Sequence, residues 1–172
     1  MSTILVAAIL VGVVVAICLL LISIHNKHKR EIMNNILKHF SQSGADNALN
    51  FSSQELLHNC VLGIDGINRK IMVVTKDESV YSSFIISLDE IKSSTVKKIY
   101  GTIKVGDLKK HKLEQYLEKV ILHFELHGKP SVEIVFYQNS NNHIYEAREL
   151  EQKAKHWEAI LSKMQKPLKN TA

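Results

Sequence analysis

The sequence predicts an α+β protein. An N-terminal transmembrane helix precedes a small antiparallel β-sheet, a partly open barrel closed by a C-terminal amphipathic helix. Three observations predict this fold: an uninterrupted apolar run at 4–24, short segments of period two between 61 and 136, and apolar positions at helical spacing over 147–164. We therefore expect a transmembrane anchor at 1–24, a juxtamembrane helix and linker at 25–57, a β-rich domain at 58–165 and a tail at 166–172.

The apolar run at 4–24 contains 21 residues without a charge, Asn, Gln or Pro. At about 1.5 Å per residue, one helix of this length crosses the ~30 Å hydrocarbon core of a bilayer. The run is longer than the apolar core of a secretory signal and follows an uncharged start, so we expect a retained single-pass anchor. Lys27, Lys29 and Arg30 follow the run and no positive residue precedes it. The positive-inside rule then places the C-terminal domain in the cytoplasm, at the inner (plasma) membrane.

Small residues recur every four positions in this run, at Ala8, Gly12 and Ala16. This spacing lets two helices approach closely, which predicts a helix–helix seam and a homo-oligomer through the transmembrane helix. The plain alternative is that Ala and Gly are common in membrane helices. After the run, one apolar face predicts a short helix at 31–40, and the Ser- and Gly-containing residues 41–47 indicate a linker.

The β-rich part begins after a segment that can be interpreted in two ways. Ser52 and Glu55 have the spacing of a capping box, which predicts one helical turn, but a first strand within 48–57 is left open. Six strands are then expected, at 61–64, 71–74, 81–87, 94–100, 119–127 and 132–136. Asp65-Gly66 indicates the tight turn of the first hairpin, because Gly tolerates the positive φ angles of such turns.

The final element is a helix with one apolar stripe. Its apolar positions are Ala147, Leu150, Ala154, Trp157, Leu161 and Met164. The stripe covers fewer than the three to four heptads that indicate a coiled coil. Packing against the protein's own sheet is therefore the favoured interpretation.

The order of these elements resembles the pleckstrin-homology-like fold, in which a bent antiparallel sheet is closed at one end by a C-terminal helix. The residues that carry the resemblance are the hairpin 62–65/70–74, the segment 86–93 and the helix segment 149–157. The chain looks like bacterial single-pass membrane proteins of uncharacterised activity that carry such a domain in the cytoplasm. The resemblance covers about residues 58–165.

No catalytic or metal-binding pattern appears in the sequence. His123 and His127 fall on a predicted strand, where a separation of four residues corresponds to roughly 13 Å. Cys60 has apolar neighbours that favour a buried thiol, and the two cysteines provide neither a disulfide framework nor a metal motif. We therefore expect no cofactor, no metal and no enzymatic activity.

Between Lys92 and Lys112 there are seven lysines and one acidic residue, Asp107. The candidate contact residues are Lys97, Lys98, Lys104, Lys109, Lys110 and Lys112. A solvated charged loop is the plain alternative. The functional interpretations are contact with anionic lipid or with an acidic protein, and the scarcity of aromatics argues against nucleic acid.

These observations predict a membrane-tethered, non-enzymatic binding module at the cytoplasmic membrane face, which binds lipid head groups or an acidic protein partner. The alternative is a structural subunit of a larger membrane complex, assembled through the anchor and the C-terminal helix.

Overall fold

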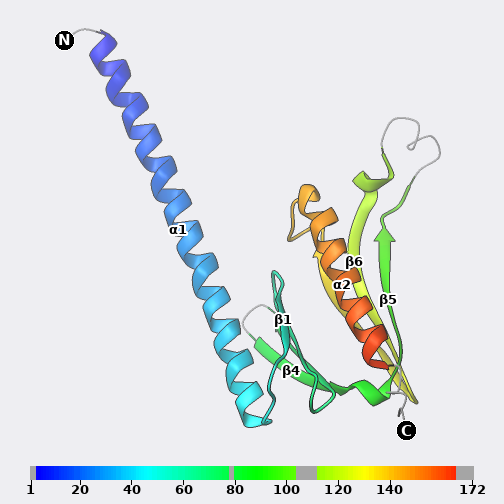
Figure 1. The fold of residues 1–172 in the computed structure, drawn as a ribbon. Coiled ribbons are helices and arrows are strands. Elements are labelled where there is room, and N and C mark those ends of the chain that lie inside the picture. The colour runs from blue at the N-terminus through cyan, green and yellow to red at the C-terminus, as the bar shows by residue number, and fades with distance from the viewer. Residues whose placement is uncertain (1–2, 78–79, 104–111, 166–172) are drawn as a thin grey trace.

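The computed structural model describes residues 3–77, 80–103 and 112–165; for residues 3–11, 22, 25, 26, 28, 29 and 165 it describes the backbone alone. Two long helices and two antiparallel sheets make up these residues (Figure 1). The helices are α1 (Thr3–Asp46) and α2 (Ala147–Gln165). Sheet A has the order β1-β2-β3-β4 and contains β1 (Ser53–Leu56), β2 (Cys60–Asp65), β3 (Lys70–Asp77) and β4 (Val80–Ser87). Sheet B has the order β5-β6-β7 and contains β5 (Ile91–Tyr100), β6 (Leu117–Leu126) and β7 (Lys129–Gln138). Three short 3₁₀ turns are η1 (Leu88–Glu90), η3 (Leu113–Tyr116) and η4 (Ile144–Glu146).

The predicted transmembrane anchor at 1–24 is contradicted. Among the described residues, no helix is both long enough and apolar enough to cross a membrane. The same finding contradicts the prediction of a single-pass protein of the inner membrane. The placement of the C-terminal domain in the cytoplasm depended on that anchor and loses its basis.

The C-terminal part of α1 packs against the outer face of sheet A. Ile36 and Phe40 are buried there in a small apolar cluster with side chains of β2 and β3. The ring of Phe40 lies 4.5 Å from the ring of Phe51, centroid to centroid. Gly63 of β2 makes room for both rings, since a Cβ at this position would meet Phe40 and lie 2.8 Å from Phe51 Cδ1. The helix continues to Asp46, so the predicted linker at 41–47 begins later than expected.

The main core lies between the two sheets and α2. Its buried side chains include Leu62, Ile64, Ile71 and Val73 of sheet A, Val120, Leu122 and Phe124 of sheet B, and Ala154, Trp157 and Leu161 of α2. Trp157 is 1% exposed. The prediction that the C-terminal helix packs against its own sheet is confirmed.

The sheets do not form a closed barrel, so the predicted barrel closed by a helix is wrong. Within the described chain no strand of sheet A pairs with a strand of sheet B. The turn η1 redirects the chain between β4 and β5, which lets the two sheets diverge instead of sharing one ladder. The described parts of the chain contain seven strands, and the first, β1, falls within the range that the sequence left open.

The predicted helical turn near Ser52 is wrong, because this segment pairs with β2. The hydroxyl of Ser52 donates to the carbonyl of Ile64 at 3.1 Å. Glu55 Oε1 forms an ion pair with Lys153 Nζ of α2 at 3.2 Å. Both side chains thus have partners distant in sequence, and neither caps a helix.

The turn between β2 and β3 is built around a fully buried carboxylate, Asp65. It accepts hydrogen bonds from the backbone N–H groups of Asn50 at 2.7 Å and of Ile67 and Asn68 at 2.9 Å. The side-chain amide of Asn68 donates a fourth, at 2.7 Å. These donors, led by the Asn50 N–H, lower the pKa of Asp65 to about 2. The predicted hairpin is confirmed, with a charged centre that also ties it to the segment before β1.

Candidate functional site

The structure divides the predicted lysine cluster. Lys97 and Lys98 are neighbours on β5, so their side chains point to opposite faces of sheet B. Lys98 Nζ lies 2.7 Å from Glu151 Oε2 of α2, and this hydrogen bond raises the pKa of Lys98. This ion pair therefore links α2 to sheet B within the same chain. Lys112 is exposed and precedes η3. Of the other predicted contacts, Lys104, Lys109 and Lys110 lie outside the described residues.

One lysine that the sequence analysis did not single out lies beside Lys97. The register pairs Lys97 with Ile121 and Lys119 with Ile99, which makes Lys97 and Lys119 diagonal neighbours on one face of the β5–β6 hairpin. Neither forms an ion pair with another residue that the structure describes. Lys97 and Lys119 are named the basic face here, and the predicted contact Lys112, which is exposed before η3, is grouped with them.

The small residues of the predicted seam have no described neighbour. The side chain of Ala8 is outside the described part of α1, Ala16 is exposed, and a Cβ at Gly12 would meet nothing within 4 Å. The helix–helix seam therefore stays a prediction. Figure 1 shows this half of α1 projecting away from the sheets. Its exposed apolar side chains are Val13, Val14, Val15, Ile17, Leu19, Leu20, Leu21 and Ile24.

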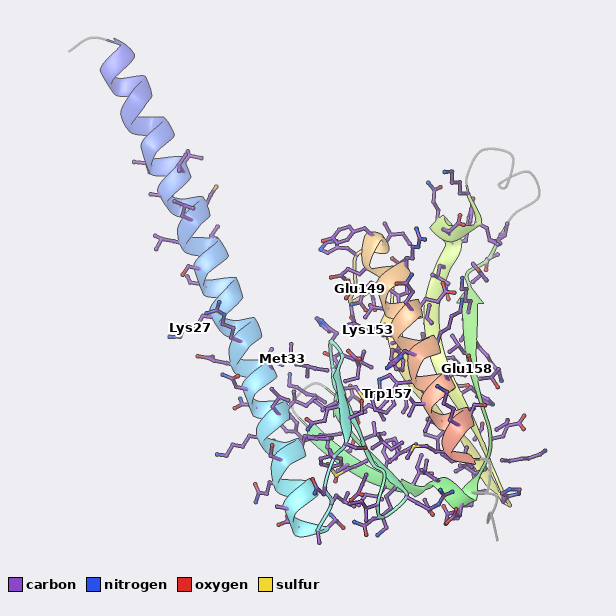
Figure 2. The ribbon with its side chains drawn as sticks, in the orientation of Figure 1. Lys27, Met33, Glu149, Lys153, Trp157 and Glu158 are labelled. Carbon is purple, nitrogen blue, oxygen red and sulfur yellow. The ribbon has the colours of Figure 1, made fainter. Side chains whose placement is uncertain are left out.

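A groove of about 670 Å³ lies between α1, the β1–β2 turn and the β7–α2 connection. Ile32 and Met33 form its α1 side, and Figure 2 labels Met33 where the helix faces the β domain. Leu56 and Leu57, from the end of β1 and the turn after it, and Leu150 of α2 also line it. The polar residues around these apolar side chains are His58, Asn59, Lys76, Asn139, Ser140, Asn141, Asn142, His143 and Glu146.

Local hydrogen bonds fix the loop that forms one rim of the groove. The N–H groups of Asn141 and Asn142 both donate to the carbonyl of Gln138 at 2.9 Å. Asn142 Oδ1 accepts from the N–H of Gln138 at 3.1 Å. Glu146 then caps the start of η4 by accepting from the N–H of His143 at 2.9 Å. The rim is therefore held in shape by its own polar residues before any ligand arrives.

A second, smaller hollow of about 190 Å³ adjoins the groove and is named the cleft here. One wall is the inner face of sheet A, with Cys60, Val73, Thr75 and Phe84; the other is β7 between 133 and 138. The groove and the cleft share five lining residues: His58, Asn59, Lys76, Asn141 and Asn142. The two hollows are therefore parts of one depression.

The side chains that line this depression are mainly apolar or carry amide and imidazole groups. Burial raises the pKa of the Cys60 thiol to about 12, which keeps it protonated and unreactive at neutral pH. In the residues that the structure describes, no group of three or more His, Cys, Asp or Glu side chains could hold a metal ion. What the depression offers is apolar contact surrounded by amide donors and acceptors.

The sequence analysis missed this depression, although two signals for it were present. The run 138–143, Gln-Asn-Ser-Asn-Asn-His, places five amide or imidazole side chains between a strand and a helix. Ile32 and Met33 continue the apolar stripe of α1 beyond Ile36 and Phe40, which are covered by sheet A. What could not be read from the sequence is that these two segments face each other.

Comparisons with protein-family models, with curated proteins and with solved structures find no match to this chain. The resemblance to membrane proteins with a pleckstrin-homology-like domain therefore has no support beyond the residues on which it was based.

Proposed function

We propose that this protein is a non-enzymatic binding module that holds a partner protein in the groove between α1 and the β7–α2 connection. The observation that carries the proposal is the composition of the groove. Apolar side chains from α1, from the segment around β1 and from α2 line it together, and a polar loop held by its own hydrogen bonds forms one rim. Apolar surface bordered by a polar rim is the usual anatomy of a protein–protein interface.

The surface beside the groove favours a protein over a small molecule. Ile144 and Tyr145 of η4 follow the rim residue His143 and are 48% and 75% exposed. They extend the apolar area beyond the groove itself, which a small ligand would leave uncovered. Exposed apolar area next to a polar rim is typical of a surface that another protein covers.

The apolar stripe of the C-terminal helix offers little exposed surface for the alternative, a subunit assembled through that helix. Of its six positions, Ala154, Trp157 and Leu161 are each at most 1% exposed. They are covered by sheets A and B of the same chain.

Photo-crosslinking in the full chain tests the groove. A benzophenone amino acid at the exposed rim position Asn141 should give one crosslinked species of discrete mass in the cells that produce the protein. The same amino acid at Ile67, which is 83% exposed in the β2–β3 turn, should not. Adding Met33→Arg to the Asn141 probe should abolish the crosslinked species, because a charge then lies among the apolar side chains.

Two results contradict the proposal: no crosslinked species from Asn141, or the same species from Ile67 or in the presence of Met33→Arg. Unchanged Trp157 emission in the Met33→Arg variant is the control for folding.

The basic face supports a second candidate, an acidic protein partner at Lys97, Lys112 and Lys119. Its specific support is the shared face of Lys97 and Lys119 and their lack of ion pairs among the described residues. Poly-L-glutamate serves as the probe. The full chain should elute from it at higher salt than the variant with all three lysines replaced by Gln.

A matched control replaces three other exposed lysines, Lys27, Lys38 and Lys163, and should elute with the unmodified protein. Equal elution of both triple variants contradicts the second candidate. Retention by phosphatidylserine vesicles without retention by poly-L-glutamate would assign the basic face to lipid instead.

A further inference from the structure

The two sheets have four edge strands, and they are not equally accessible. The edges are β1, β4, β5 and β7. On β5, the N–H of Val96 donates to Glu158 Oε1 of α2 at 3.0 Å, and Figure 2 shows Glu158 on the side of α2 near β5. β1 has four residues, and its Glu55 is bridged to Lys153 of α2. α2 therefore occupies or restricts two of the four edges.

The two remaining edges differ in what lies beside them. On β4, Phe84 is the one residue that lines the groove or the cleft. On β7, four consecutive residues, Glu133, Ile134, Val135 and Phe136, line the cleft. Successive side chains of a strand point to opposite faces of its sheet. When residues from both faces of a strand line the same hollow, the edge of that strand, with its backbone groups, must face the hollow. The edge of β7 therefore faces the cleft.

An edge strand carries a row of N–H and C=O groups without ladder partners. In this protein the row on β7 faces a hollow whose far wall is mainly apolar, with Cys60, Val73 and Phe84 of sheet A beside the single hydroxyl of Thr75. The charged side chains that line the cleft are Lys76 and Glu133, one of each sign. Recognition in the cleft therefore depends on backbone hydrogen bonds and apolar contact, and a charged ligand has no advantage.

We infer that a segment of the partner binds the cleft in extended conformation and adds to β7 as the fourth strand of sheet B. The segment is uncharged and has apolar residues at alternate positions, so that one row of side chains packs against sheet A. Residues 133–138 provide about 20 Å of strand. Beyond Gln138 the depression continues into the groove through the shared residues Asn141 and Asn142. This inference rests on the proposed function and names how the partner is recognised.

Hydrogen exchange on the full chain tests the inference with a defined probe. The probe is a pool of end-blocked hexapeptides in which Thr or Asn alternates with Val or Leu, at about 1 mM. At a free concentration of twice the Kd, binding should slow exchange of the cleft-facing amides in 133–138 about threefold. Amides of β4 serve as the internal control and should not change. A second pool, N-methylated at alternate residues, keeps the side chains but lacks half of the N–H donors and should give no protection.

A pair of size-matched variants locates the binding site. Thr75→Phe fills the cleft and should abolish protection. Ser131→Phe adds an aromatic ring to an exposed position of the same strand β7, outside the cleft, and should leave protection unchanged. Unchanged Trp157 emission in both variants shows that the fold is retained.

The outcomes separate this inference from the proposed function. Equal protection by the N-methylated pool, or protection that survives Thr75→Phe, overturns strand addition. Absence of protection at 133–138 by the pool without N-methylation overturns it too. The groove crosslink at Asn141 does not depend on any of these results, so a protein that crosslinks through Asn141 but fails here binds its partner by another mode.

Discussion

Replacing Trp157 by alanine removes the largest fully buried side chain of the main core. The ring is 1% exposed and lies in the core formed by both sheets and α2. A buried Trp removes about 200 Å² from water, which at about 25 cal/mol per Å² corresponds to about 5 kcal/mol. Measured costs of truncating a buried aromatic residue to alanine are about 3–5 kcal/mol, which agrees with this area-based value. We therefore expect Trp157→Ala to lower the free energy of unfolding by about 3–5 kcal/mol.

Urea unfolding followed by circular dichroism measures this change, since the variant has no tryptophan left to report by fluorescence. Tyr145→Ala is the matched control, because this aromatic side chain is 75% exposed just before α2. It should change the free energy of unfolding by at most about 0.5 kcal/mol. An unchanged midpoint for Trp157→Ala would refute the docking of α2. Emission typical of water-exposed tryptophan in the unmodified protein would refute it independently.

Three further predictions concern the turn, the docking of α1 and the attachment of α2. Because the pKa of Asp65 is lowered to about 2, its contribution to stability is present above about pH 4 and lost as the pH falls from about 4 to about 2. Asp65→Asn should therefore destabilise the protein at pH 6, and urea midpoints of the two proteins should converge toward pH 2; a constant difference would contradict this. Gly63→Ala should cost about 1–3 kcal/mol, since its Cβ would overlap Phe40. Gly12→Ala, with open space around it, should cost nothing measurable by urea unfolding, and equal effects of the two variants would argue against the docking of α1. Lys98→Gln should lower the free energy of unfolding by at most about 1 kcal/mol, because the ion pair with Glu151 is partly exposed. A larger decrease in the same assay would contradict this reasoning.

The sequence predicted those elements whose pattern reflects one buried face. β6, β7 and α2 were found because their apolar residues recur at the period of the element and point into the main core. β2 and β3 were found as continuous apolar runs, because one face of each lies in the main core and the other lies under α1. β1 was left open for a different reason. Glu55 fits a local capping pattern, but its observed partner, Lys153, is almost a hundred residues away, and no local rule can reveal such a contact.

Glycine was also misread where its role is packing. Gly44 indicated a linker in the sequence, yet it lies in the last turns of α1, where a Cβ would approach Phe51 Cε2 to 2.7 Å. The predicted lysine cluster was wrong in part for a related reason. Neighbouring residues on a strand point to opposite faces, so Lys98 forms an ion pair with Glu151 and Lys97 does not. Sequence spacing thus located the charges, and the fold decided which of them remain available.

The continuity of α1 couples its two ends mechanically. Thr3 to Asp46 is one helix, and Met33, on the wall of the groove, is about 45 Å from the start of that helix at 1.5 Å per residue. A rotation of the helix by about 10° about this point displaces its first turn by about 8 Å at that length. The C-terminal part of the helix lies beside the proposed binding groove and its N-terminal half projects away from the sheets. A small change of angle at Met33 therefore moves the far end of the helix by several ångströms.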